Sequence, residues 1–425
     1  MNGPDLPLPA PLEAAPLPEV TNHTPWPSQY FQHVDPFDEI FHVMVCRTTY
    51  RLAQRGGADG EAFEPVLLPP GEQPPLCEAD QYRAAINASS VIQESDLAPY
   101  KPKCDVLVVN ARAYSPKGRP SARWQAGFGF GEAIRKVFQV TGPRERTKGL
   151  LGWQLSAPEP VTQVPIVYEL AFGGPNTVSA QQALDELAAA PHLGPAEEAR
   201  VAQAIEELPE HAPNNPIGRG RDPEPLLRAL EGVRALLEAQ RGLDWAQVQR
   251  TYRAAPQIEA LDTPFIGQAD YPVVGLGPMG RWWQPRLALT GTHGEAWKAT
   301  QWPRSPRDHD YRYWNCAPED QQIAYPQGGE TVALIHLTPP AGSGGDTMRF
   351  ALPRQDLQLL LRLSAGPLLF APMHIDTVII DPEAATLTVV RRATVSARTG
   401  LRALELGTWP PGTRASLAPE RPHGR

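Results

Sequence analysis

The stretch that decides the fold is HIDTVIIDPEAATLTVVRRATV, residues 374–395. Its first part, residues 374–381, is rich in β-branched side chains that follow a period of two, and this pattern favours a β-strand. The Asp-Pro-Glu-Ala at 381–384 has the composition of a turn, and residues 386–395 return to the β-branched pattern. We therefore predict a β-hairpin toward the C-terminal end of the chain.

Outward from this hairpin, the chain carries further β-like runs. The consecutive apolar residues 106–109 predict a strand that is covered on both faces. Residues 356–363, by contrast, are predicted to form a short helix. Proline supplies 49 of the 425 residues, about twice the usual ~5%, and it interrupts helices, so we expect many short elements joined by stiff loops. The predicted strands are residues 41–50, 105–111, 136–141, 164–169 and 331–337.

Between residues 177 and 255 the period of the apolar pattern changes to that of a helix. Asp222-Pro223 suits the start of a helix, and Ser179 with Gln182 has the form of a capping box. This segment is either a peripheral hairpin that stabilises the fold or a lobe that binds a partner. The apolar stripe has spacings of 4, 3 and 4 over Leu226, Leu230, Val233 and Leu237.

These patterns together predict a mainly β (α+β) protein with a large antiparallel β body and one helical insertion. A chain of 425 residues exceeds the usual size of a single domain, so several parts are expected. The predicted parts are a flexible Pro-rich tail over 1–20, a β-rich N-terminal part over 21–176, the helical insertion over 177–255, a β-rich C-terminal part over 256–410 and a flexible tail over 411–425.

The charge and the cysteine content argue against several classes of protein. The net charge is −8, whereas binding to nucleic acid or to an anionic membrane needs a basic surface. The first twenty residues contain no Lys or Arg and no long apolar run, so they do not resemble a signal peptide. The four cysteines are too dispersed for a zinc or redox motif and are expected to be reduced core residues. We expect a soluble, cytoplasmic protein that binds neither nucleic acid nor membrane.

The sequence carries no GxSxG, Walker or HExxH motif. His and carboxylate residues concentrate only at Asp308-His309-Asp310 and at His374-Ile375-Asp376. In a strand, His374 and Asp376 would point to one face, and a metal site there would need another ligand from elsewhere. We predict structural His–Asp pairs and no metal, cofactor or catalytic residue. The alternative function is a hydrolase or other enzyme that uses Asp308, Asp310, His374 and Asp376.

A polar signature at residues 95–106 reads SDLAPYKPKCDV. Its two prolines hold the backbone extended, and Asp96 can cap a turn through its carboxylate. Lys101 could pair with Asp96 or with Asp105 as the chain enters the apolar strand. We therefore expect a rigid, charge-locked turn at this position.

Three further signatures are rich in Gly, Pro and Trp. The first begins at Tyr168, and its double glycine allows positive φ after a strand. In it, Glu169 could pair with Arg286 or Arg219. Asp320 belongs to the last signature. These signatures are YELAFGG at 168–174, NPIGRG at 215–220, and a third that joins GPMGRWWQPR at 277–286 to DHDY at 308–311 and NCAPEDQ at 315–321.

Aromatic residues gather between positions 282 and 314. Aromatic side chains contribute strongly to protein cores and to interfaces. A core role is the default interpretation, but a segment this rich in loops and prolines is also expected to line a groove with some of them. The candidate partner-binding residues are Trp282, Trp283, Trp297, Trp302, Tyr311 and Trp314.

The order and number of these signatures resemble the bacterial domain-of-unknown-function 2169 family, from Asn22-His23-Thr24-Pro25 to near Leu406. The family usually has an Arg where Leu170 stands, so an ion pair centred on that Arg would be missing here. The resemblance implies an accessory protein of type VI secretion. Such a protein is a cytoplasmic, non-enzymatic adaptor or chaperone that binds a toxic effector, or the PAAR-type spike tip that bears it, and promotes its loading for secretion.

Overall fold

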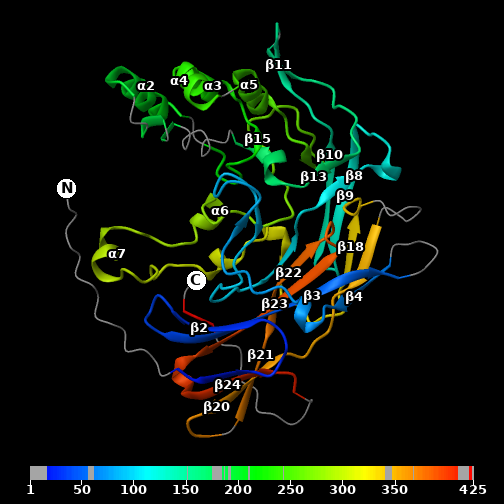
Figure 1. Cartoon of the computed structure of the whole chain (residues 1–425), viewed down its shortest axis with the longest axis vertical. Helices are drawn as coiled ribbons and strands as arrows, with labels where there is room; N and C mark the ends of the chain where they lie inside the picture. Colours follow the sequence, from blue (N-terminus) through cyan, green and yellow to red (C-terminus); the bar gives the residue numbers. More distant parts are fainter. Residues whose placement is uncertain are drawn as a thin grey trace.

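The structure is a computed structural model of the chain. Within the described residues, the strands form three large sheets and four two-stranded ladders, and the longer helices cluster at one end of the molecule (Figure 1). The protein is therefore mainly β with some helices, as the sequence predicts. The described residues are 17–55, 62–150, 152–174, 184–185, 187–189, 193–208, 211–242, 244–339, 347–366, 368–409 and 421–423.

The largest sheet has seven strands among the described residues: β2 (Ser28–Val34), β3 (Ile40–Gln54), β4 (Phe63–Leu67), β7 (Cys104–Val108), β17 (Gln322–Ile323), β22 (His374–Asp381) and β23 (Thr386–Ser396). Their order is β17–β7–β22–β23–β3–β2, and β4 also pairs with β3. Strands β7 and β22 are parallel, and the other neighbours are antiparallel. The long strand β3 carries β2 along its first half and β4 along its second half.

Strands β22 and β23 form the hairpin that the sequence predicts. The pairing register shifts between Ile375 and Thr377, so Asp376 occupies a β-bulge. Almost all residues of both strands are buried. The apolar alternation therefore does not separate core from solvent, because other parts of the chain cover both faces of this sheet.

A five-stranded sheet packs against one end of the large sheet and encloses the main core. Its strands are β9 (Arg123–Phe130), β10 (Ile134–Thr141), β16 (Ile258–Ala260), β18 (Thr331–Ile335) and β19 (Thr347–Ala351), in the order β16–β10–β9–β18–β19. Buried side chains from the two sheets form one apolar cluster between them. This cluster includes Val106, Val378 and Leu387 of the large sheet and Phe128, Phe138 and Val332 of the smaller one.

A four-stranded sheet covers the other end of the same face. Its strands are β1 (Glu19–Asn22), β20 (Gln358–Leu363), β21 (Leu368–Pro372) and β24 (Leu401–Gly407), in the order β1–β24–β20–β21. Along β3, Met44 and Cys46 enter this second core, whereas Tyr50 and Leu52 enter the first. These four residues lie on one face of β3 because they are separated by even intervals. One long strand thus supports two packed sheets.

Several predicted elements differ from the structure in type or in bounds. The helix predicted at 356–363 is wrong, because β20 pairs there with both β21 and β24 and its leucines are buried in the second core. Leucine favours helices, but this local preference is overridden by the strand pairing. The strand predicted at 164–169 is only β13 (Gln163–Pro165), followed by a 3₁₀ turn at Tyr168–Leu170. The predicted N-terminal tail ends earlier than residue 20, since β1 begins at Glu19.

The insertion is helical, as predicted, and its described helices are α2 (Pro195–Glu206), α3 (Glu224–Glu231), α4 (Arg234–Arg241) and α5 (Trp245–Arg253). They stand together at the end of the molecule opposite β20 and β24 (Figure 1). Their buried residues form a separate core. The stripe from Leu226 to Leu237 belongs to two helices, because the chain turns at Gly232 and Val233. The predicted capping box at Ser179 and Gln182 lies outside the described residues.

Loops and short elements join these layers. No helix in the described ranges is both long and apolar enough to cross a lipid bilayer. All four cysteines are buried and free, as predicted. The short strands and helices among these connections are β5 (Gln81–Tyr82), β6 (Val91–Gln93), β8 (Arg112–Tyr114), β11 (Arg146–Gly149), β12 (Gly152–Leu155), β14 (Phe172–Gly173), β15 (Arg219–Gly220), α6 (Gln284–Leu287) and α7 (Glu295–Thr300).

Candidate functional site

The signature at residues 95–106 forms a buried ionic network beneath the large sheet. The Nζ of Lys101 lies 2.8 Å from Oδ2 of Asp105 and 2.9 Å from Oγ1 of Thr377 on β22. Asp105 also accepts hydrogen bonds from the Asn315 side chain and from the backbone N–H groups of Cys316 and Ala317. Of the two partners predicted for Lys101, the structure selects Asp105. The signature at 95–106 and the stretch at 315–321 thus meet at the Asp105 carboxylate.

Asp96 has a different cationic partner. Its carboxylate accepts hydrogen bonds from Nη1 of Arg47 at 2.9 Å and from the backbone N–H of Cys77 at 2.8 Å. The Arg392 guanidinium donates to the Asp96 carbonyl oxygen and to the carboxylate of Asp376, whose Oδ2 lies 2.6 Å from its Nε. These groups are buried. The network is therefore a structural lock, in line with the charge-locked turn that the sequence predicts.

The signature at 168–174 and the signature at 215–220 are joined by hydrogen bonds of Asn215. Its Nδ2 donates to the carbonyl oxygens of Tyr168 and Phe172 at 2.8 and 3.0 Å, and β14 pairs with β15 beside it. A Cβ on Gly173 would lie 2.1 Å from the Asn215 carbonyl oxygen, so only glycine fits at this close approach. Gly174 has φ of 59°, as the double glycine predicts. These signature residues therefore build the fold locally.

The pairing predicted for Glu169 is wrong for Arg286, whereas Arg219 does lie close to Glu169. Its carboxylate accepts hydrogen bonds from the backbone N–H and the hydroxyl of Ser90. Arg219 instead donates to the Glu169 carbonyl oxygen at 2.6 Å, and Arg286 pairs with Glu94. Sequence spacing gave no signal for these contacts, because Ser90 lies 79 residues from Glu169 and Glu94 lies 192 residues from Arg286.

The four residues of the alternative enzymatic function lie in two places: Asp308 and Asp310 in one segment, and His374 and Asp376 on β22. Asp308 accepts hydrogen bonds from the backbone and hydroxyl of Thr292, and Asp310 pairs with Arg312. On β22, the His374 ring stacks on Tyr325 with ring centroids 4.6 Å apart. Asp376 is the ion-pair partner of Arg392. Burial lowers the pKa of His374, although the nearby Asp376 opposes this shift. Each acidic side chain of the set therefore has a structural contact in the fold.

The six aromatic candidates for partner binding differ greatly in exposure. Trp283 and Tyr311 are each only 2% exposed and belong to the interior, so the prediction that they contact a partner is wrong. Trp283 packs edge-on against Tyr168, and the Tyr311 hydroxyl lies 2.7 Å from Nε2 of His33. Trp302 is 41% exposed. The half-buried members of the set are Trp282, Trp297 and Trp314.

Trp302 lies on a loop that we call the tryptophan lobe, residues 290–309. The loop includes α7 and extends away from the sheets (Figure 1). Its base is closed by a hydrogen bond from the Asp310 N–H to the Leu289 carbonyl and by the contacts of Asp308 with Thr292. Inside the lobe, the indole N–H of Trp297 donates to the carbonyl of Arg304 at 2.8 Å. The lobe therefore has internal order despite its small size.

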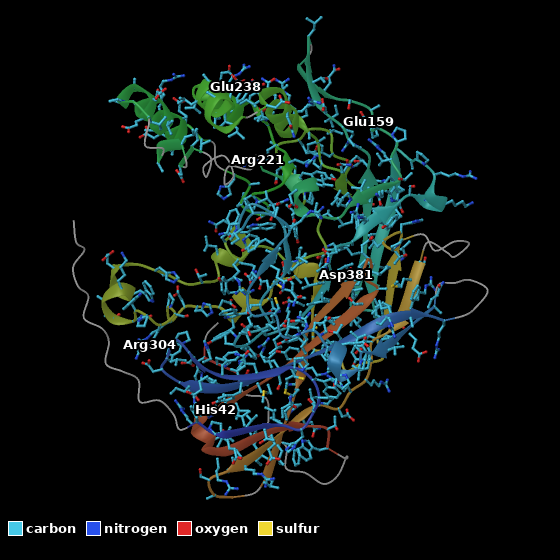
Figure 2. All side chains as sticks on the ribbon, in the orientation of Figure 1. His42, Glu159, Arg221, Glu238, Arg304 and Asp381 are labelled. Carbon is cyan, nitrogen blue, oxygen red and sulfur yellow. The ribbon has the colours of Figure 1, made fainter. Side chains whose placement is uncertain are left out.

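The lobe also contacts the turn between β2 and β3. Arg304, which points from the lobe toward this turn in Figure 2, forms an ion pair with Asp38. The Arg307 guanidinium lies over the ring of Phe37, 5.9 Å from its centroid. Phe37 is 50% exposed. Trp302 and Phe37 thus give this side of the molecule two exposed aromatic side chains, and sequence reasoning had singled out only the first.

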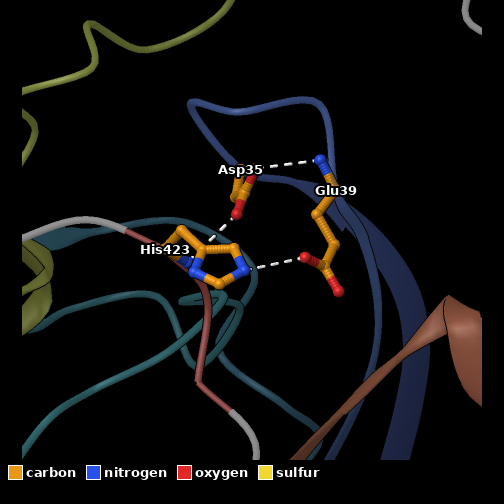
Figure 3. A group of neighbouring side chains, drawn as sticks. All are labelled: Asp35, Glu39 and His423. Carbon is orange, nitrogen blue, oxygen red and sulfur yellow. Dashed lines mark hydrogen bonds and ion pairs between the residues drawn. The ribbon is translucent and has the colours of Figure 1, made fainter.

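A carboxylate–histidine cluster joins the same turn to residues 421–423 (Figure 3). The ligand-type atoms of Asp35, Glu39 and His423 lie within 4.8 Å of one another. The Asp35 carboxylate accepts three backbone N–H groups, those of Phe37, Glu39 and His423. Glu39 contacts the Ser396 hydroxyl, Arg398 and Nε2 of His423. The cluster is thus internally hydrogen-bonded and attaches residues 421–423, which lie within the predicted C-terminal tail.

The fold and its surface define a β-rich protein with a helical insertion, whose signature residues stabilise the interior and whose projecting lobe presents aromatic side chains. The chain belongs to the DUF2169 family, described as an uncharacterized protein conserved in bacteria, whose family model matches residues 39–392. The match spans the helical insertion and most of both β-rich parts. No curated protein and no solved structure matches the chain.

Proposed function

We propose that the protein is a non-enzymatic adaptor or chaperone of type VI secretion. It binds a secreted effector, or the PAAR-type spike tip that bears the effector, in the bacterial cytoplasm and promotes loading for secretion. The family resemblance of the signatures motivates this proposal. The internal pairing of the signature charges supports it, because Lys101, Asp105, Asp376 and Arg392 stabilise the fold and leave partner recognition to the surface.

The observation that carries the proposal is the exposed aromatic surface of the tryptophan lobe. Trp302 is 41% exposed on a loop whose base is closed by backbone and carboxylate contacts. Tryptophan is enriched among the residues that dominate binding energy at interfaces. Phe37, which lies beside Arg307 of the lobe, extends this surface toward the sheet. An ordered loop of this kind presents an aromatic anchor at a low entropic cost.

The proposal is tested by co-purifying the full chain with the effector and the PAAR-type spike protein encoded beside its gene. Wild-type protein is expected to form a stable complex with at least one of them. Trp302→Ala is expected to weaken it by about 2 kcal/mol, which is roughly a thirtyfold rise in Kd. Ile86→Ala is the control, because Ile86 is 67% exposed and lies in a different segment. Failure of wild-type protein to bind either candidate would contradict the proposal.

A further inference from the structure

Two of the signatures, the one at 168–174 and the joined one between 277 and 321, meet around a surface groove with a volume of about 700 Å³, which we call the proline groove. Its residues come from segments far apart in the sequence: β10, the turn after β13, the loop before β15, and the long segment from Pro272 to Asp320. Three prolines stand along its sides. The lining residues are Lys136, Tyr168, Asn214, Pro272, Val273, Val274, Met279, Pro285, Pro318, Glu319 and Asp320.

The floor of the groove is apolar and held by close packing. Tyr168 is buried, donates from its hydroxyl to the Gly277 carbonyl at 3.0 Å and packs edge-on against Trp283. A Cβ on Gly275 would lie 2.3 Å from the Tyr168 ring, so the ring lies directly on the backbone. Val273 and Met279 join this cluster from the groove side. The groove is therefore preformed, which lowers the entropic cost of binding.

The rim of the groove carries a negative charge. Asp320 has a side chain that is 57% exposed, and Glu319 beside it is also exposed. The ammonium group of Lys136 lies below them, 2.8 Å from Oδ1 of Asp320 and 2.9 Å from Oε1 of Gln321, and its side chain is only 11% exposed. Arg312, on which Glu319 acts electrostatically, is paired with Asp310. Two exposed carboxylates thus face solvent above one covered ammonium group.

We propose that the proline groove binds an extended segment of the partner protein that carries a Lys or Arg next to an apolar side chain. The apolar side chain contacts Val273 and Met279, and the basic side chain lies beside Glu319 and Asp320. This inference rests on the proposed function, since it specifies what the adaptor recognises on its partner. The groove and the tryptophan lobe are linked by α6, which supplies Pro285 to the rim and ends shortly before the lobe begins.

Charge complementarity selects this occupant. An acidic segment would place like charges beside the two rim carboxylates, which disfavours binding. Proline lacks a backbone N–H, so the prolines of the groove cannot donate hydrogen bonds to a partner strand. Side-chain contacts must therefore recognise the partner. Extended segments suit a groove with proline walls and an aromatic floor because they lose little further backbone freedom on binding.

The test uses short overlapping peptides that cover the effector and spike protein found in the complex with the full chain. Binding is measured by fluorescence anisotropy at two salt concentrations. The peptides that bind wild-type protein are expected to contain a basic residue beside an apolar one, and their affinity should fall as salt rises. Glu319→Lys is expected to weaken them about tenfold, with Glu319→Gln intermediate.

Glu198→Lys is the matched control, because it makes the same charge change at an exposed position of α2 in the helical insertion and should leave affinity unchanged. If the complex forms but its binding peptides lack a basic residue, or Glu319→Lys binds them as wild type does, the groove inference is wrong while the adaptor function stands. If wild-type protein forms no complex with effector or spike protein, both are wrong. A circular-dichroism spectrum like that of wild type confirms that each variant is folded.

Discussion

Lys101 and Asp105 form an ion pair with 2.8 Å between Nζ and Oδ2, and their side chains are 4% and 0% exposed. They stand four residues apart, yet they are joined across the start of β7 and not along a helix. The same ammonium group also binds the Thr377 hydroxyl, which ties this loop to the bulged strand β22. The pair is therefore the link between the polar signature at 95–106 and the central hairpin.

Removing the cation of this pair should strongly destabilise the protein. Lys101→Met leaves the Asp105 carboxylate buried without its ion-pair partner, and the expected loss is about 3–5 kcal/mol in the free energy of unfolding. Urea unfolding followed by circular dichroism measures this change. Lys298→Met is the control, because Lys298 is 52% exposed, and its pair with Glu295 should contribute at most about 1 kcal/mol. Equal effects of the two substitutions would show that burial of the pair is unimportant.

The stability of the protein should depend on the neutral form of His33. Burial lowers the pKa of His33 from 6.5 to about 4, with Asp35 opposing and His309 reinforcing the shift. Because the folded-state pKa lies below the unfolded value, the unfolded chain binds more protons between these values. Stability contributed by neutral His33 is complete above pH 6.5 and is lost as pH falls toward 4.

His33→Gln tests this pH dependence, since glutamine retains an acceptor for the Tyr311 hydroxyl without a titratable ring. The free energy of unfolding is measured by urea titration at several pH values from 7 to 4. The fall in stability should be shallower in the variant than in wild type. Other histidines with lowered pKa values, such as His309, act in the same direction in both proteins, so only the difference reports on His33. Parallel pH profiles would refute the assignment.

Truncation of Trp283 should destabilise the protein, whereas truncation of Trp302 should leave its stability almost unchanged. Trp283 is 2% exposed and packs on Tyr168, so Trp283→Ala should cost about 3–5 kcal/mol and lower the thermal midpoint by many degrees. Trp302→Ala should leave the midpoint within a few degrees of wild type. Differential scanning calorimetry compares the two. A large loss of stability in Trp302→Ala would place this side chain in the core and remove the lobe from the candidate binding surfaces.

Gly275 should tolerate no side chain. Gly275→Ala would place its Cβ 2.3 Å from the Tyr168 ring, so the ring and the floor of the proline groove must shift. We expect a loss of about 1–3 kcal/mol, the usual cost of overpacking a core. Gly71→Ala is the control, because no atom lies within 4 Å of its Cβ position. The thermal midpoints of both variants measure the difference, and a neutral Gly275→Ala would mean that the Tyr168 ring moves freely.

The local sequence determined those elements whose signal lies in neighbouring residues. The hairpin of β22 and β23, the buried strand β7 and the helical nature of the insertion follow from side-chain period and turn residues alone. The pairing of Lys101 with Asp105 was one of two local possibilities, because either carboxylate lies within a few residues of the lysine. Dispersed cysteines likewise indicated buried, free thiols.

Only the tertiary structure decided features that depend on partners distant in the sequence. Strand β20 forms because β21 and β24 flank it, and their pairing outweighs the helical preference of its leucines. Arg286 selects Glu94, 192 residues away, and not Glu169. Exposure separates Trp302 from Trp283, although both are tryptophans in one loop-rich segment. Residue type and local spacing define what a side chain can do, whereas packing of remote segments determines whether it is buried, paired or open to a partner.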